Sequence, residues 1–296
     1  MIHPVKIKLR SIHSFLSLLL VLHCAPLNAQ TGTTLDFYLT PSISAATMQQ
    51  QGTFLKNYLE KETGLAIQLH VPDNYEQLVE KFGGARPCFA MMSSQSYVLA
   101  NKKYGAQVKL RAVRFGHSVY YGMIVANTLS GIKKLTDLQG KTIAYTDALS
   151  TSGYLFPRKL LERSGTKPGK ELWAGKHDDV IKLVYEGKAD AGAAFYSPPS
   201  SSGEIRDARE RVKKIFPDVE KKVIIIAKTE GIPNDPVVFS KSFDAETARK
   251  LYTALVKLSQ DGKGKQVLLE LYGIEGFAKA SDADYNSLRA IVDGKK

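Results

Sequence analysis

The chain has 296 residues, of which 44% are hydrophobic and 24% are charged, and its formal net charge at pH 7 is +12. This length can supply the core of one large domain or of two ordinary ones, and the composition excludes an intrinsically disordered or collagen-like chain. An excess of Lys and Arg is a feature of nucleic-acid-binding proteins, so the position of these charges decides what they mean.

Part of the charge lies in a predicted signal peptide. Three cations precede an apolar run from Phe15 to Leu22, and the small residue Ala29 follows. This order is typical of a secretory signal, and the run is too short to span a bilayer, which takes about 20 apolar residues. We therefore predict a signal peptide at residues 1–29 and export to the periplasm. Cleavage there leaves 38 Lys and Arg against 29 acids, a net +9.

The two cysteines have different predicted fates. Cys24 lies near the end of the apolar run, where a lipoprotein would be processed, but the residue before it is His23 instead of a small residue. We therefore expect no lipid anchor. The mature chain then keeps Cys88 alone, which excludes an internal disulfide. Cys88 is either a catalytic thiol or, as its apolar neighbours favour, a small buried residue.

The first third of the mature chain alternates strand and helix patterns. Leu65, Ile67 and Leu69 alternate with polar residues, as in a half-buried strand. Other stretches carry apolar residues at helical spacing. We predict strands near 35–39, 65–71 and 88–92. We predict one helix that carries Phe54 to Leu59 and ends before Gly64, a second that begins at Tyr75, and a third near 96–103. The order β-α-β-α-β is typical of a mostly parallel sheet covered by helices.

A second set of the same kind follows residue 126. We predict strands at 141–145, 189–195 and 223–227, helices near 153–161 and 180–187, and a loop at 197–203. The charged stretch 204–214 is predicted to be a surface helix, and three helical segments near 244–259, 263–272 and 282–292 complete the chain.

Two apolar strands, 120–126 and 223–228, flank the second set. A chain that leaves one lobe and later returns to it forms two lobes joined by two crossings, which can act as hinges around a ligand cleft. We therefore predict an α/β fold of two lobes. Lobe 1 comprises residues 31–125 with 230–296 returning to it, and lobe 2 comprises residues 126–229.

The segment Ser150-Thr151-Ser152-Gly153 is the most informative part of the sequence. It follows a predicted strand and opens a predicted helix, where free N–H groups and the helix dipole favour an anion. Hydroxyl groups add donors, and Gly153 permits close approach. The alternative is that a Ser or Thr simply caps the helix. Pro157 requires either that the regular helix starts near Gly153 or that it bends.

Four further residues are candidates for the same cleft. His177 and Tyr75 each begin a predicted helix, where they could donate to an anion or be an ordinary turn residue and a packed ring. Tyr120 begins the first crossing strand. Asp235 lies in a turn just past the second crossing.

Enzyme, metal and nucleic-acid functions are disfavoured. The sequence contains no Gly-x-Ser-x-Gly, Walker loop, His-Glu-x-x-His or Cys-x-x-Cys. The three mature histidines lack metal-ligand spacing. Lys and Arg are scattered without interleaved aromatic residues, unlike a nucleic-acid-binding face. We predict no catalysis, no cofactor and no metal.

Several segments together resemble the phosphate/phosphite/phosphonate-binding proteins of ABC importers, which are two-lobed periplasmic solute receptors. The resemblance runs from about residue 35 to 240. It is carried by 138–145 with 150–157, and supported by 72–79, 96–100, 187–192 and 232–236. It implies a type II-like periplasmic-binding-protein fold with the two crossing strands as its hinge.

The resemblance also implies roles. The Ser150–Gly153 segment would hold the oxyanion, and His177, Tyr75 and Tyr120 would complete a pocket of neutral donors. Asp235 matches an acid that faces the ligand amine in members that take aminoalkyl phosphonates. Their second carboxylate is expected near Ser197, where this chain has none. This departure puts an aminoalkyl ligand in doubt.

We therefore expect a monomeric periplasmic protein that captures a phosphorus oxyanion (phosphonate, phosphate or phosphite) and delivers it to an ABC permease at the inner membrane. The alternative from another class is an input protein that presents the ligand to a membrane sensor kinase. Neighbouring permease genes or a neighbouring kinase gene would separate the two. A third possibility, an enzyme on the same fold, lacks a visible nucleophile–base pair.

Overall fold

The computed structural model describes residues 1–4 and 34–294. The predicted signal peptide, with Cys24 and Ala29, lies outside these residues except for its first four. Within the part of the chain that is described, no helix combines the length and apolarity that a membrane span requires.

The first lobe is built on a six-stranded sheet in the order β12-β4-β11-β3-β1-β2. The strand β1 is parallel to its neighbours β2 and β3, whereas β11 and β12 run antiparallel to the strands they pair with. Strands from the C-terminal part of the chain thus complete the sheet that the N-terminal part begins. The strand bounds are β1 Leu35–Leu39, β2 Ile67–His70, β3 Cys88–Met91, β4 Gln107–Val113, β11 Pro236–Phe239 and β12 Gly276–Lys279.

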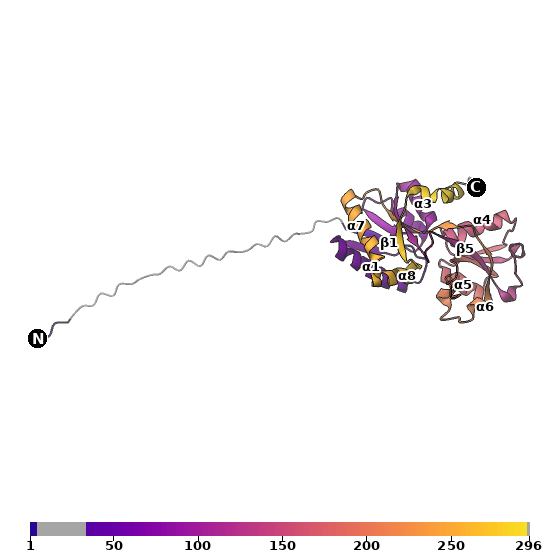
Figure 1. Cartoon of the computed structure of the whole chain (residues 1–296), viewed down its shortest axis with the longest axis horizontal. Coiled ribbons are helices and arrows are strands. Elements are labelled where there is room, and N and C mark those ends of the chain that lie inside the picture. Colours follow the sequence, from indigo (N-terminus) through magenta and orange to yellow (C-terminus); the bar gives the residue numbers. More distant parts are fainter. Residues whose placement is uncertain (5–33, 295–296) are drawn as a thin grey trace. The chain divides into compact units, whose positions relative to one another are not determined.

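Helices cover both faces of this sheet because its strand residues are apolar on both sides. Phe37 and Leu39 pack into a core with α1, α7 and α8, while Tyr38 between them faces a second core with α2, α3 and α9. Figure 1 shows α1, α7 and α8 gathered beside β1. The helix bounds are α1 Ala45–Thr63, α2 Tyr75–Lys81, α3 Ser94–Tyr104, α7 Ala245–Leu258, α8 Gly262–Tyr272 and α9 Asn286–Val292.

The second lobe has a sheet in the order β10-β5-β8-β6-β7, with β9 also paired to β5. The helices α5 and α6 cover one face and α4 covers the other (Figure 1). This pattern confirms the predicted α/β class and its two lobes. The bounds are β5 Val119–Asn127, β6 Thr142–Tyr145, β7 Lys170–Trp173, β8 Ala191–Tyr196, β9 Val223–Lys228, β10 Ile232–Pro233, α4 Phe156–Arg163, α5 His177–Tyr185 and α6 Val219–Lys222.

The chain crosses between the sheets twice, just before β5 and between β10 and β11. The first crossing turns at Phe115 and Gly116, which have φ values of 53° and 73°. The second contains Asn234, whose buried amide donates to the carbonyl oxygens of Ala112 at 2.9 Å and His117 at 2.8 Å. One side chain therefore ties the two crossings together. The predicted crossing strands, β5 and β9, pair with each other within the second sheet.

The predicted surface helix at 204–214 is wrong. This stretch contains a single helical turn, Glu210–Val212. The residues before this turn are held in a non-helical conformation by Asp207. Its carboxylate accepts the backbone N–H of Arg209 at 3.0 Å and pairs with the Arg209 guanidinium at 2.8 Å. Both side chains are buried, and such local side-chain-to-backbone bonding competes with helix formation.

Candidate functional site

Five helix starts surround one cavity of about 1260 Å³ between the two sheets. In each case a strand ends and a helix or helical turn begins: β1 leads to α1, β2 to α2, β3 to α3, β6 toward α4 and β7 to α5. The first turn of a helix presents N–H groups without intrahelical partners and the positive end of the dipole. The cavity is therefore built to hold a negative charge. First-turn and cap residues on its wall are Ser44, Tyr75, Ser93, Ser150, Thr151, Ser152 and His177.

The predicted Ser-Thr-Ser segment forms a wide helical turn on the cavity wall. Residues Thr151–Leu155 are π-helical, and the N–H of Leu155 donates to the Ser150 carbonyl at 3.0 Å. The Ser150 hydroxyl accepts the N–H of Gly153 at 3.1 Å, so Ser150 is also the cap of this turn. The regular helix α4 starts only at Phe156. Pro157 therefore lies in the first turn of α4, where a proline costs no hydrogen bond.

Gly153 lies behind the three hydroxyl residues and is not part of the cavity wall. A Cβ atom at this position would lie 2.1 Å from Oγ1 of Thr146 and 2.9 Å from the Ser150 hydroxyl. Because real Cβ atoms do not approach so closely, the turn can adopt this conformation only with glycine here.

Hydrogen bonds join the two lobes around the cavity. The hydroxyl of Thr151 accepts the backbone N–H of Gln95 at 2.9 Å, and the Ser93 hydroxyl donates to the Leu149 carbonyl at 2.9 Å. The backbone N–H of His177 points to the Ser42 carbonyl at 3.4 Å. Residues of the candidate site thus also make contacts that hold the lobes together.

His177 lies on the cavity wall with its ring at 84° to that of Phe195, and the two ring centroids are 5.1 Å apart. Its Nδ1 is buried without a hydrogen-bond partner. Burial, followed by the charges of Arg211 and Arg114, lowers its pKa to about 3. His177 is therefore neutral at pH 7 and offers one ring nitrogen to a ligand.

Tyr75 and Tyr120 face the same cavity from the two lobes. Burial, together with nearby carboxylates, raises the pKa of both phenols above the ordinary value. The Tyr75 hydroxyl interacts with Ser150 and Ser42, and the Tyr120 hydroxyl donates to Asp235 at 3.2 Å. Both phenols therefore stay protonated and remain hydrogen-bond donors over the physiological pH range.

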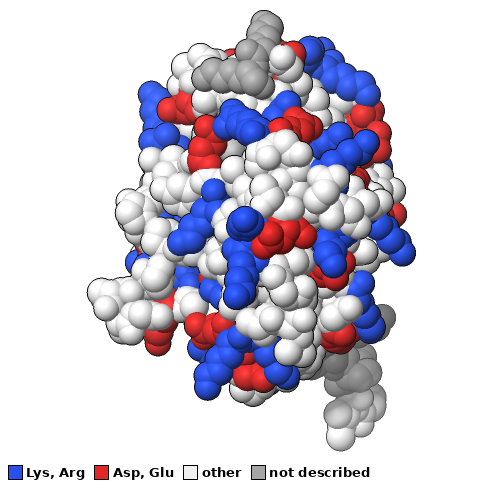
Figure 2. All heavy atoms as spheres, turned by 90° about the vertical axis from the view of Figure 1, so that its right-hand side faces the viewer, with Lys and Arg blue, Asp and Glu red and all other residues white. Residues whose placement is uncertain are grey.

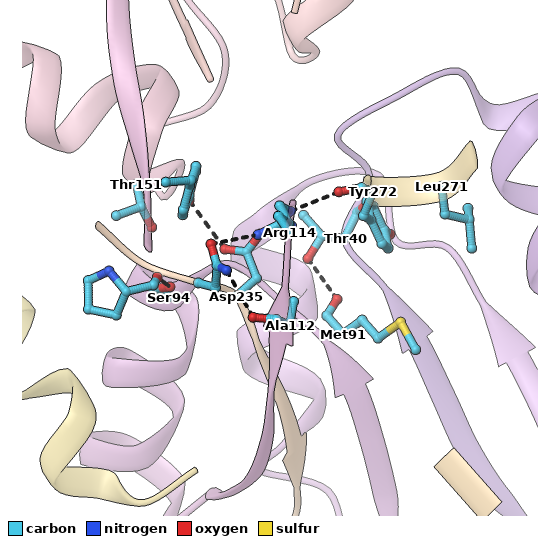
Figure 3. A network of polar contacts seen from close by, with 12 residues as sticks. Thr40, Met91, Ser94, Ala112, Arg114, Thr151, Asp235, Leu271 and Tyr272 are labelled. Carbon is cyan, nitrogen blue, oxygen red and sulfur yellow. Dashed lines mark hydrogen bonds and ion pairs between the residues drawn. The ribbon is translucent and has the colours of Figure 1, made fainter. Parts of the chain in front are cut away.

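Asp235 forms an ion pair that the sequence did not reveal. Its Oδ2 lies 2.7 Å from Nη2 of Arg114, whose Nε donates to the Tyr272 carbonyl at 2.8 Å. Figure 3 shows the Arg114 guanidinium between the Asp235 carboxylate and Tyr272. Arg114 directly follows β4, where a lone arginine resembles any solvated strand end. Its role depends on a partner 121 residues further along the chain.

Arg211 is a second cation on the cavity wall that sequence reasoning missed. Its Nη2 donates to the Leu271 carbonyl of the first lobe at 3.1 Å, and its buried Nε has no partner. Arg211 lies in the stretch 204–214, which was wrongly predicted to be a surface helix. Nothing in the sequence therefore indicated that its side chain lines the cleft. The expectation of a pocket with neutral donors alone is therefore incomplete.

Two further predicted positions have clear surroundings. Ser197 is buried on the cavity wall, so a hydroxyl stands where the resemblance leads one to expect a carboxylate. Cys88 is buried in β3, and burial raises the pKa of its thiol to about 12. The described residues contain no group of three or more His, Cys, Asp or Glu side chains that could hold a metal ion.

The surface of the second lobe carries mixed charge. Figure 2 shows Lys and Arg interspersed with Asp and Glu across this face. Several of these charges form ion pairs, such as Lys182 with Asp179 and Lys213 with Glu220. The positive charge on this face is therefore spread out instead of forming one basic stripe.

The sequence matches a known family and several curated relatives. A family model described as the periplasmic substrate-binding protein of phosphonate ABC transporters matches residues 37–285. A phosphate-import protein of Mycolicibacterium smegmatis is 28% identical over 177 residues, which cover 55% of each chain. The phosphonates-binding periplasmic protein of Escherichia coli is 23% identical over 263 residues, covering 87% of this chain and 75% of that protein. The chain thus spans about half the length of the mycobacterial relative.

Solved structures share the fold. A binding protein component of an ABC phosphonate transporter from Pseudomonas aeruginosa aligns with a TM-score of 0.77 at 18% identity, covering 89% of this chain and 87% of that one. The PhnD1 protein of Prochlorococcus marinus, solved in complex with methylphosphonate, aligns with a TM-score of 0.74 at 19% identity, covering 89% and 98%. At these identities the likeness concerns the fold.

Proposed function

Because the chain belongs to the family of periplasmic substrate-binding proteins of phosphonate ABC transporters, we propose that it captures a phosphorus oxyanion between its two lobes and delivers it to an ABC permease. The observation that carries this proposal is the convergence of five helix starts on one cavity, with the buried hydroxyl residues Ser150, Thr151 and Ser152 on its wall. We further propose that the protein acts without catalysis, as a monomer, after removal of residues 1–29.

The bound anion would be surrounded by donors. The hydroxyls of Ser150 and Ser152 supply one side, and Nδ1–H of a neutral His177 supplies another. Tyr75 reaches the anion from the first lobe. Hydrogen bonds to a charged acceptor contribute about 1.5 to 3 kcal/mol each, roughly twice a neutral bond. Arg114 and Arg211 add positive potential, so the anion is matched by both dipoles and charges.

Ligand capture would be coupled to lobe closure. The proposed donors belong to both lobes, and a ligand that contacts both binds the closed state better than the open one. Such differential binding shifts the population toward the closed form. The cross-lobe bond from Gln95 to Thr151 is already made in the described structure, so it is one of the contacts that would hold the two lobes together around a bound anion.

Thermal unfolding of the full protein tests this proposal. We would compare methylphosphonate, phosphate, phosphite and 2-aminoethylphosphonate with sulfate as a non-phosphorus anion. A ligand at about 100 times its dissociation constant adds about 2.7 kcal/mol of stability, which raises Tm by roughly 5 to 10 °C. Stabilisation by at least one phosphorus anion is the expected result. Absence of a shift with all of them would overturn the proposed function.

A variant locates the site. Ser152→Ala removes one hydroxyl donor without removing the Ser150 cap, and we expect it to weaken binding by about tenfold or more. The matched control is Ser287→Ala, an exposed serine on α9, which should bind like the wild type. Titration calorimetry measures both. Equal affinities for the two variants would mean that the anion binds elsewhere.

A further inference from the structure

The Arg114–Asp235 ion pair sets which phosphorus anions fit the cavity. We propose that this receptor takes phosphorus anions that carry no ammonium group, because Asp235, a carboxylate on the cavity wall that could otherwise pair with such a group, is already neutralised by Arg114. This inference rests on the proposed function and narrows it from phosphorus anions in general to those with an uncharged or absent substituent.

Both oxygens of the Asp235 carboxylate are engaged. Oδ2 accepts from Nη2 of Arg114 at 2.7 Å, and Oδ1 accepts from the Tyr120 hydroxyl at 3.2 Å. The two charged side chains are largely buried, with 10% of Arg114 and 26% of Asp235 exposed. In such a setting the carboxylate's charge is satisfied inside the protein. An ammonium ion entering the cavity would have to compete with a guanidinium already in place.

Arg114 is also held in position by groups other than Asp235. Its Nε donates to the Tyr272 carbonyl at 2.8 Å, its Nη1 lies 3.4 Å from Oδ1 of Asn234, and the guanidinium lies over the Tyr120 ring at 5.2 Å. Asn234 is itself fixed by its bonds across the two crossings. Moving Arg114 aside for a ligand amine would break several contacts at once.

The other buried carboxylates on the cavity wall face cations as well. Asp207 is paired with Arg209 at 2.8 Å, and the charges that act most strongly on Asp178 are those of Arg211 and Lys182. Oδ1 of Asp178 has no hydrogen-bond partner, but burial raises the pKa of this carboxyl and thus weakens it as a counter-ion. Near His177 the charges of Arg211 and Arg114 dominate, and they would repel an ammonium group.

The test compares two ligands with the same two-carbon chain, of which one carries a terminal amine. The full protein is titrated with ethylphosphonate and with 2-aminoethylphosphonate by calorimetry. We expect the wild type to bind ethylphosphonate at least about tenfold more tightly. Arg114→Gln frees Asp235 and removes the repelling charge, so the ratio should shift toward 2-aminoethylphosphonate by about tenfold or more. The control Arg158→Gln removes a half-exposed arginine of α4 outside the cavity wall and should leave the ratio unchanged.

The outcomes separate this inference from the proposed function. Tighter binding of 2-aminoethylphosphonate by the wild type would overturn the inference while leaving a phosphorus-anion receptor intact. An unchanged ratio in a folded Arg114→Gln variant would overturn the role given to the ion pair. If that variant fails to fold, the wild-type ratio alone still decides. Binding of neither phosphonate, nor of phosphate or phosphite, would overturn the proposed function and the inference with it.

Discussion

His177 illustrates how the cavity controls a single side chain. The ring is buried, two arginines lie near it, and Nδ1 has no partner in the protein. All three conditions disfavour the protonated ring until an anion arrives. A bound phosphorus anion would satisfy Nδ1 and add a negative charge, which favours the opposite state. The surroundings of His177 thus favour the protein with an anion bound, and they lower the stability of the folded protein without a ligand.

That cost predicts a pH dependence of stability in the absence of ligand. The folded-state pKa of His177 is about 3, below the ordinary value of 6.5 for a histidine. Between these values the unfolded chain binds the additional proton, so lowering the pH destabilises the folded protein. From pH 7.5 to 5.5 this group should cost about 1.4 kcal/mol of unfolding free energy.

Urea denaturation at the two pH values measures this term. The wild type should lose about 1.4 kcal/mol more than His177→Gln over this range, because all other groups cancel in the difference. The control His117→Gln alters an exposed histidine and should keep the wild-type loss. Equal pH dependence in His177→Gln and the wild type would show that His177 is not buried as described.

At the scale of elements, the turn before α4 is the part of the site that tolerates least change. Gly153→Ala would place a Cβ 2.1 Å from Oγ1 of Thr146, so the turn must shift. We expect a loss of about 1 to 3 kcal/mol in stability, as for overpacking in a core. Anion binding should weaken as well, because Ser150 and Ser152 move with the turn.

The matched control for this change is Gly262→Ala. Gly262 is the first residue of α8 and has open space around its Cβ position, so alanine there should be neutral or slightly stabilising. Urea denaturation and methylphosphonate titration compare the two variants. If Gly153→Ala matched Gly262→Ala in both, the close packing at Thr146 would not constrain the site.

Local patterns predicted the elements that position most of the site. The strand β1, the helix α2 starting at Tyr75 and the helix start at His177 follow from apolar spacing and cap residues. Other elements depend on distant partners. The four-residue strand β11 is inserted antiparallel between β3 and β4, which no local pattern specifies. The strand β4 did carry a signal, since Val108, Leu110 and Ala112 alternate with polar residues.

The site residues also divide into those that a local pattern or the family resemblance indicated and those that depend on distant partners. The Ser150–Gly153 segment could be proposed from its place between a strand and a helix, while the family resemblance supplied the grouping of Tyr75, Tyr120 and Asp235. Arg114 and Arg211 could not be predicted, because an arginine in the sequence looks the same whether it is solvated or paired in a cleft. Their neighbours, Asp235 and the carbonyl of Leu271, come from other parts of the chain.

At the scale of the whole molecule, both sheets contribute to the walls of the same cavity. Both present the ends of parallel strands to one cavity, so helix starts from each lobe meet there. The crossings are tied by Asn234, close to Asp235 and Arg114, so the hinge region adjoins the candidate ligand site. A ligand that touches these residues can therefore bias lobe closure directly.

For the whole molecule, the positions of the charged residues say more about anion binding than the net charge does. The predicted signal peptide carries three of the positive charges, and on the face of the second lobe that Figure 2 shows, Lys and Arg are mixed with acids. Of the cations on the cavity wall, Arg114 and Arg211 are the two whose charges act on His177, and the overall count does not distinguish them. The remaining charge can attract anions weakly from a distance.

The central claim is that the Ser150–Gly153 turn holds the phosphorus anion. The most direct measurement is a crystal structure of the full protein grown with methylphosphonate. We expect phosphonate oxygens within about 3 Å of the hydroxyls of Ser150 and Ser152 and of Nδ1 of His177. A phosphonate bound instead among Arg206, Lys213 and Lys214 on the cavity wall, with the turn unoccupied, would contradict it.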